Sequence, residues 1–168
     1  MTKPVLPDAE HLLATLTAQM RPHVTAQTGL IGIVTGGAWL AARLHRNLEL
    51  KVPPGSLDVS FYRDDFQHKG LKHQVAPSAI PFEVEGRDLI LVDDVLYTGR
   101  TIRAAMNELF DYGRPASIRL AALVDRGGRE LPIAAQFIGA ALEVPAKYNI
   151  HLEQDEQGNL HLVLHPKN

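Results

Sequence analysis

The stretch with the clearest chemical pattern is residues 89–101, which read LILVDDVLYTGRT. Four apolar residues lead directly into two carboxylates, Asp93 and Asp94, and a short polar loop with one glycine precedes a helical pattern that opens at Thr101. A buried strand, a loop and a helix N-terminus in succession aim unpaired backbone N–H groups and the positive end of a helix dipole at one point. This junction is typical of a phosphate site, and the acids beside it could accept hydrogen bonds from sugar hydroxyls.

Other interpretations of this stretch stay open. It has neither the lysine of a Walker A loop nor the G-x-G-x-x-G fingerprint of dinucleotide-binding folds. Paired acids at a strand end could bind Mg²⁺ for phosphoryl transfer. The Asp and Thr residues could also be caps of an ordinary strand-to-helix turn. The TGRT segment that follows the acids favours a binding site over that structural role.

Composition restricts the class of protein. The chain has 168 residues, of which 45% are hydrophobic and 21% charged, so we expect residues 1–168 to form a single domain with a real core. No apolar run is long enough to span a bilayer and the N-terminus lacks the apolar stretch of a signal peptide, which favours the cytoplasm. The absence of cysteine excludes thiol catalysis, disulfides and cysteine-based zinc sites. The net charge of -2 does not favour a nucleic-acid binder, although a local basic patch would suffice.

Apolar segments that alternate with helical patterns predict the elements around the acids. Strands are expected at residues 30–34, 57–62, 89–92, 117–124 and 135–138, and helices at residues 8–22, 39–48 and 101–109. Strands separated by helices imply a parallel sheet of about five strands with helices on both faces. Two further segments stand apart: residues 64–80 read as a long mobile loop, and residues 151–164 as a hairpin that turns at 157–159.

Four polar residues, Thr35, Arg63, Asp93 and Asp125, each follow a predicted strand directly. Because ligands of such sheets bind outside the carboxyl ends of the strands, we expect these residues to converge on one crevice. The Thr-Gly-Gly segment at residues 35–37 could present bare backbone N–H groups to a phosphate, since glycine permits close approach. An ordinary strand-to-helix turn would have the same sequence.

The pattern at residues 89–101 resembles the signature of the phosphoribosyltransferases that use 5-phosphoribosyl-1-pyrophosphate (PRPP). Within that family it is most similar to PyrR proteins, pyrimidine operon attenuation proteins that also have uracil phosphoribosyltransferase activity. Further matches are GIVTGG at residues 32–37, FYRDD at 61–65 and LVDRGGRELPI at 123–133. The resemblance implies an α/β phosphoribosyltransferase fold with a parallel sheet, a mobile lid over PRPP at residues 64–80 and the C-terminal β-hairpin.

The resemblance also implies roles for individual residues. Asp93 and Asp94 would face the ribose hydroxyls and, with Arg63, form the catalytic group, although Arg63 could instead pair with a neighbouring aspartate. Mg²⁺ would be carried by PRPP, with no direct protein ligands. Asp125 and Arg126 would frame the base pocket, although a turn with a salt-bridged arginine explains them equally well. The residues expected to bind PRPP are Thr35, Gly36, Gly37, Val95, Leu96, Tyr97, Thr98, Gly99, Arg100 and Thr101.

For several other side chains the sequence allows more than one role or indicates no specific one. Arg100 could bind phosphate or simply face solvent, and Tyr97 could be a packing aromatic. The eight histidines show no metal-binding spacing. We expect His151, His161 and His165 to be solvent-facing positions of the terminal hairpin.

The implied partners are PRPP, uracil and UMP or UTP, together with pyrimidine-operon mRNA, in a homo-oligomer (dimer or tetramer) without membrane contact. Two alternatives remain: an RNA-binding regulator with little catalysis, or a phosphoribosyltransferase for another base such as hypoxanthine or orotate. Some PyrR proteins have Arg in place of Gly36 and His in place of Gly128. The first helix is part of the RNA face in that family, and only Lys3 and Arg21 are Lys or Arg in the first forty residues here.

Overall fold

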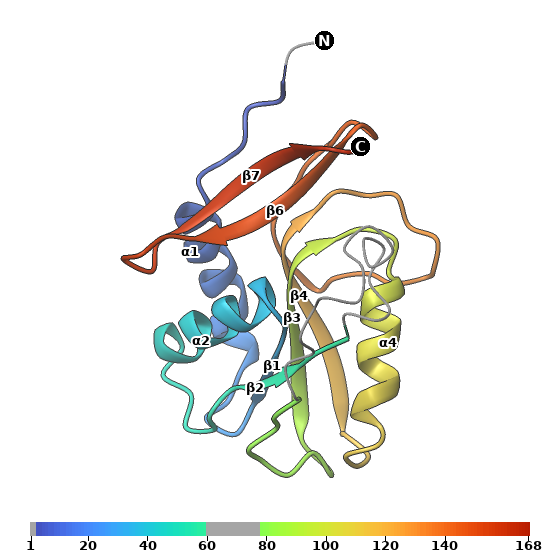
Figure 1. The fold of residues 1–168 in the computed structure, drawn as a ribbon. Helices are drawn as coiled ribbons and strands as arrows, with labels where there is room; N and C mark the ends of the chain where they lie inside the picture. The colour runs from blue at the N-terminus through green and yellow to red at the C-terminus, as the bar shows by residue number, and fades with distance from the viewer. Residues whose placement is uncertain (1–2, 60–77) are drawn as a thin grey trace.

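The computed structural model describes residues 3–59 and 78–168 (Figure 1). The candidate residue Arg63 and nearly all of the lid predicted at residues 64–80 lie outside the described residues. Among the described residues, no helix is long and apolar enough to cross a membrane.

Five parallel strands form the central sheet, in the order β2-β1-β3-β4-β5. Leu91 at the centre of the sheet pairs with Ile31 on one side and Leu120 on the other. Half of the strand expected at residues 57–62 lies outside the described residues, which end at residue 59 here. In the described half, the observed strand ends at Leu57, and Val59 is buried without belonging to it. The strands are β1 (Gly29–Ile33), β2 (Gly55–Leu57), β3 (Asp88–Leu96), β4 (Ser117–Asp125) and β5 (Phe137–Ala141).

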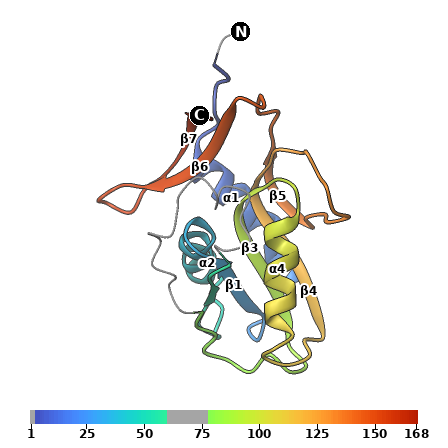
Figure 2. The same ribbon diagram turned by 45° about the vertical axis from the view of Figure 1, so that its right-hand side comes forward.

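Helices cover both faces of this sheet, as the sequence predicts (Figure 2). Alternate residues of a strand point to opposite faces, so Ile90 packs in the cluster under α1 and α2, whereas Leu91 packs under α4. The Asp8 side chain caps the first helix by accepting from the Glu10 N–H at 3.0 Å. The helices are α1 (Ala9–Met20), η1 (Arg21–His23), α2 (Gly36–Asn47) and α4 (Arg100–Leu109).

A two-stranded antiparallel hairpin, β6 (Tyr148–Gln154) and β7 (Leu160–Pro166), lies across the carboxyl end of the sheet (Figure 1). Its residue Ile150 is buried in the same cluster as α1 and α2. Glu10 on α1 ties the three parts together, because it forms a 2.6 Å ion pair with Arg43 on α2 and accepts from the Leu160 N–H at 3.0 Å. The hydrogen bond from Arg43 lowers the pKa of Glu10. The hairpin is therefore fixed as a cover over the edge where the site lies.

Candidate active site

Asp93 and Asp94 lie inside β3, and not after it as the sequence suggested. The strand continues to Leu96 because its backbone keeps pairing with β4, where Leu96 is opposite Asp125. Both carboxylate residues are buried, with 4% and 8% of their surface exposed. Buried carboxylates need hydrogen-bonding partners, because an unpaired buried charge is costly.

The backbone holds these two carboxylates in place. The Asp94 N–H donates to Asp93 Oδ1 at 2.9 Å, and the Val95 N–H donates to Asp94 Oδ1 at 2.8 Å. The N-terminus of α2 lies against the second acid, because a Cβ at Gly36 would be 2.5 Å from Asp94 Oδ2. A Cβ at Gly37 would overlap the carbonyl oxygen of Val92. The predicted pyrophosphate segment therefore adjoins the acids through glycines that no other residue can replace without movement.

The segment after β3 is a short loop that ends in the helix α4. Gly99 is the N-cap residue, with a φ of 93° in the left-handed region, and the helix begins at Arg100, one residue before the sequence indicated. The Arg100 N–H donates to Thr98 Oγ1 at 3.2 Å. The other N–H groups of the first helical turn have no carbonyl partner within the helix, so they are available to an anion. We refer to residues 97–101 as the phosphate loop.

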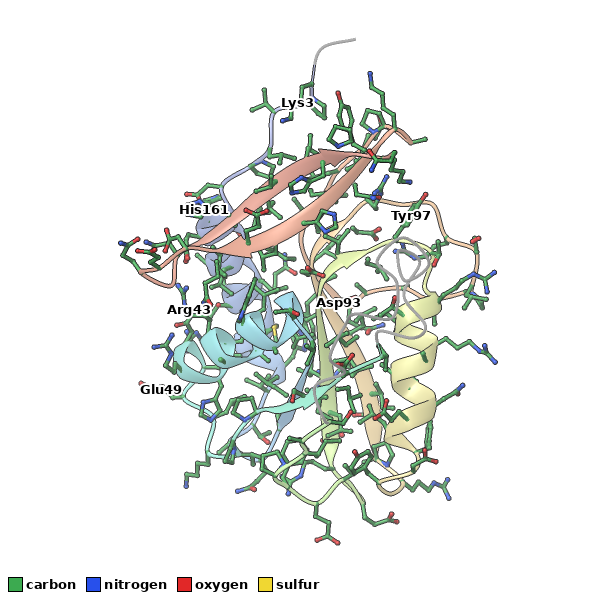
Figure 3. The ribbon with its side chains drawn as sticks, viewed as in Figure 1. Lys3, Arg43, Glu49, Asp93, Tyr97 and His161 are labelled. Carbon is green, nitrogen blue, oxygen red and sulfur yellow. The ribbon has the colours of Figure 1, made fainter. Side chains whose placement is uncertain are left out.

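A pocket joins the acids, the phosphate loop and the hairpin. In Figure 3, Asp93 and Tyr97 both lie at the carboxyl end of β3, below the hairpin. β3 supplies the acids, α4 supplies its first turn, and β6 supplies the opposite wall. The lining residues are Asp93, Asp94, Val95, Leu96, Tyr97, Thr98, Gly99, Thr101, Ile102, Arg126, Asn149, Ile150 and His151.

Some of the predicted site residues lie outside this lining. Thr35, Gly36 and Gly37 adjoin the acids from α2 but do not line the pocket. Arg100 points to solvent, where its Nε is 3.5 Å from Glu130 Oε2 and both side chains are about half exposed. This is the solvent-facing alternative that the sequence left open for Arg100.

Arg126 and Asp125 have different surroundings despite their adjacency. The Arg126 guanidinium lies 4.2 Å from the centre of the Tyr97 ring, and its buried Nε has no hydrogen-bond partner among the described residues. Burial lowers the pKa of Arg126. Asp125 is not in the lining; its Oδ1 accepts from the Gly127 N–H at 2.9 Å and its Oδ2 from Arg129 at 2.6 Å. Burial alone would raise the pKa of Asp125, but these two hydrogen bonds lower it.

The hairpin contributes lining residues that sequence reasoning did not identify, Asn149, Ile150 and His151. His151 is half-buried and belongs to the pocket lining, and its ring centre lies 5.2 Å from that of His165 across the hairpin. His161 and His165 do face solvent, each beside an acidic side chain.

The chemistry of the pocket suits a magnesium ion brought by its substrate. Across residues 3–59 and 78–168, no group of three or more His, Cys, Asp or Glu side chains could hold a metal ion. Asp93 and Asp94 nevertheless both belong to the lining, where they supply carboxylate oxygens. Mg²⁺ is commonly bound through one or two carboxylates plus substrate phosphates, and this donor set fits that mode.

Known proteins share both the sequence and the fold. The sequence model of the phosphoribosyl transferase domain matches residues 6–149. "Bifunctional protein PyrR" of Ralstonia nicotianae is 51% identical over 155 residues, 90% of this chain and 88% of that protein. The PyrR protein of Pseudomonas aeruginosa is 53% identical over 144 residues, 83% of this chain and 84% of that protein.

Solved structures agree on the architecture. A hypoxanthine-guanine phosphoribosyltransferase from Bacillus anthracis superposes with a TM-score of 0.66 at 20% identity, covering 85% of this chain and 86% of that one. A hypoxanthine phosphoribosyltransferase from Staphylococcus aureus gives a TM-score of 0.64 at 21% identity, covering 83% and 78%. At such identities the likeness concerns the fold alone. The domain match and the relatives of about 50% identity show that the chain belongs to the phosphoribosyltransferase family and, within it, to the PyrR proteins.

Proposed function

We propose that this protein is a uracil phosphoribosyltransferase that converts uracil and PRPP to UMP and pyrophosphate. The observation that carries the proposal is the single pocket that joins a buried acid pair to a phosphate loop at the start of a helix. The loop offers donors for a 5′-phosphate, and the acids offer acceptors for ribose hydroxyls. Few ligands other than a phosphorylated ribose need both sets of groups at this spacing.

The reaction exchanges one bond at C1 of the ribose for another. The bond from C1 to the pyrophosphate oxygen breaks while N1 of uracil bonds to C1, and the N1 proton is released. Positive charge develops on the ribose ring as the pyrophosphate departs, so Asp93 and Asp94 would stabilise it by their charge as well as by orienting the hydroxyls. Water exclusion by the hairpin would protect the reactive ribosyl centre from hydrolysis.

The leaving group carries high negative charge, which the chain must bind. Part of the pyrophosphate charge would be neutralised by the Mg²⁺ that PRPP carries, and the lining residues Asp93 and Asp94 would help to hold this ion. We propose that the backbone N–H groups at Thr35, Gly36 and Gly37 bind the pyrophosphate, because this segment adjoins Asp94.

Further PRPP contacts come from outside the described pocket lining. We propose that Arg63 donates to phosphate oxygens, a role suited to its planar guanidinium. We also propose that Arg100, in the phosphate loop, contacts a bound phosphate, which would compete with Glu130 for its side chain.

The base would lie between Arg126 and the hairpin. Within residues 3–59 and 78–168 the buried Arg126 Nε has no hydrogen-bond partner, and a carbonyl oxygen of uracil would satisfy this donor. Asn149 could add donors and acceptors on the opposite wall. Asp125 is engaged with Arg129, so we propose that it shapes the base pocket through the segment that follows β4.

The test is the release of pyrophosphate from Mg-PRPP with uracil, hypoxanthine, guanine and orotate supplied in turn, with UMP detected directly. We expect turnover with uracil alone. An Arg126→Met variant should raise the KM for uracil while leaving the KM for PRPP close to wild type. Turnover with a purine base or with orotate but not with uracil would refute the assignment of the base.

A second function, the regulation of pyrimidine genes through mRNA, is supported by the name of the relatives, which are called bifunctional. We propose that UMP or UTP in the pocket promotes binding of a pyrimidine-operon leader RNA. The low charge of the N-terminal region predicts a small patch and a shallow dependence on salt. Titration of leader RNA at several salt concentrations, with and without UMP, tests this. Binding to unrelated RNA that is steeply salt-dependent and insensitive to UMP would contradict it.

The domain organisation, localisation and oligomeric state of the protein are also proposals. We propose that residues 1–168 act as one cytoplasmic domain that forms a dimer or tetramer. One core cluster containing residues of α1, the sheet and the hairpin supports the single domain. The exposed side chains of Val5 and Phe110, at 95% and 58%, support contacts with a second copy. Light scattering after gel filtration measures the oligomeric state, and a monomer would contradict the last part.

A further inference from the structure

One arginine outside the pocket connects three segments around the phosphate loop. Arg129 donates from Nη2 to Asp125 Oδ2 at 2.6 Å, from Nη1 to the Tyr97 carbonyl oxygen at 2.7 Å, and from Nε to the Ile133 carbonyl oxygen at 2.7 Å. All three nitrogens of its guanidinium are therefore used within the protein. Three-quarters of its side chain is buried, and it does not line the pocket.

The segment that carries Arg129 makes a second set of contacts with the loop. The Thr98 carbonyl oxygen accepts from the Glu130 N–H at 2.9 Å and from the Leu131 N–H at 3.2 Å. Behind the next residue, a Cβ at Gly99 would be 2.9 Å from Cγ1 of Ile133. The carbonyl groups of Tyr97 and Thr98 are thus both held pointing toward the segment that follows β4.

The direction of these carbonyls sets the direction of the donors. In a planar trans peptide the C=O and the following N–H point in opposite directions. Holding the Tyr97 carbonyl toward Arg129 turns the Thr98 N–H the other way, and holding the Thr98 carbonyl turns the Gly99 N–H the other way. Thr98 and Gly99 both line the pocket, so the contacts behind the loop determine how its N–H groups face a ligand.

We propose that Arg129 is a positioning residue that orients the phosphate loop for the 5′-phosphate of PRPP without touching the substrate. This inference rests on the proposed function for the identity of the ligand. Its physical basis is the planar guanidinium fork, which reaches three acceptors in fixed directions, whereas a lysine ammonium is a single point charge on a flexible stem. The geometry of the side chain matters in this role, and its charge alone does not suffice.

The test compares Arg129→Met and Arg129→Lys in steady-state kinetics with uracil and Mg-PRPP. We expect both variants to raise the KM for PRPP by roughly tenfold to a hundredfold, because a misplacement of about 1 Å in a binding group can cost about 10²-fold. The KM for uracil should change little. Arg129→Lys should resemble Arg129→Met, since neither can hold the three acceptors together.

The matched control is Glu130→Gln. It removes the surface ion pair with Arg100, on the same segment, but leaves the backbone N–H that donates to Thr98. We expect no rise in the KM for PRPP in this variant, since loss of the Glu130 charge can only free Arg100 for a bound phosphate. A rise equal to that of the Arg129 variants would mean that any change in the segment acts on the loop, which would overturn a specific role of Arg129.

A second readout does not depend on turnover. Hydrogen–deuterium exchange of a peptide spanning the phosphate loop should be faster in Arg129→Met than in wild type, whereas a peptide spanning β1 should be unchanged. A lower melting temperature with normal loop exchange and a normal KM for PRPP would reduce Arg129 to a stabilising residue and overturn the proposal.

Two further outcomes separate the proposals from each other. Full rescue of PRPP affinity by Arg129→Lys would indicate direct charge contact with phosphate and would also overturn the positioning role. If wild-type protein forms no UMP, the proposed function fails, while the exchange measurement still decides whether Arg129 orders the loop.

Discussion

The phosphate loop makes a specific prediction for Gly99→Ala. Gly99 has a φ of 93°, and a Cβ there would lie 2.9 Å from Cγ1 and 3.1 Å from Cβ of Ile133. A left-handed backbone costs a residue with a Cβ roughly 1–2 kcal/mol, and overpacking adds roughly 1–3 kcal/mol. Because Ile133 is β-branched and stiff at χ1, it cannot move aside at low cost. We expect a loss of about 2–5 kcal/mol in the free energy of unfolding.

Urea unfolding measures this loss, and Gly86→Ala provides the matched control. Gly86 has a φ of 72°, and apart from Gly86 and its two chain neighbours no described residue has an atom within 4 Å of the position that its Cβ would take, so only the backbone cost of roughly 1–2 kcal/mol remains. The KM for PRPP should rise in Gly99→Ala and stay unchanged in Gly86→Ala. Combining Gly99→Ala with Ile133→Ala should recover part of the loss, as a double-mutant cycle shows. Equal destabilisation in the two glycine variants, without coupling to Ile133, would refute the reasoning.

Three other predictions address the ligand, the acids and the pH dependence. Saturating Mg-PRPP should raise the melting temperature, with about 2.7 kcal/mol gained at a hundredfold excess over Kd; an unchanged melting curve would contradict the PRPP site. Asp93→Asn and Asp94→Asn should each lower kcat by about 10²–10³-fold with the fold intact, as measured by UMP formation and circular dichroism, and wild-type turnover in both would remove these residues from the site. The fold lowers the pKa values of Glu10 and Asp125. In the unfolded chain these pKa values are about 4.3 and 3.9. The two carboxylates therefore contribute fully to stability above those values, and this contribution is lost as the pH falls through the lower pKa values of the folded protein. Urea unfolding below about pH 4 should therefore show that the free energy of unfolding falls less with decreasing pH in Glu10→Gln than in wild type. An equal fall in the two proteins would count against a stabilising ion pair with Arg43.

Local patterns in the sequence were sufficient to predict most elements. The apolar run before Asp93 predicts a buried strand, and the glycine after Thr98 predicts the turn into α4, because both signals depend on neighbouring residues only. The turn at residues 157–159 predicts the hairpin for the same reason. The parallel five-stranded sheet then follows from the alternation of strands and helices.

The errors concern contacts between distant segments. The sequence placed the end of the strand at the acids, but pairing between Leu96 and Asp125 on β4 extends it. No pattern in the sequence indicated that hairpin residues would line the pocket, because this depends on the position of the hairpin over β3. The partner of Asp125 proved to be Arg129, which also binds the Tyr97 carbonyl. Each of these depends on how separate elements pack, which residue spacing does not encode.

The measurement that tests the central claim most directly is a crystal structure of the protein with bound UMP. The account predicts the phosphate within hydrogen-bond distance of the N–H groups of residues 98–101 and the ribose hydroxyls on Asp93 and Asp94. The uracil ring should lie between Arg126 and the hairpin residues 149–151. UMP bound elsewhere, or bound in this pocket with its base at the phosphate loop, would contradict the account.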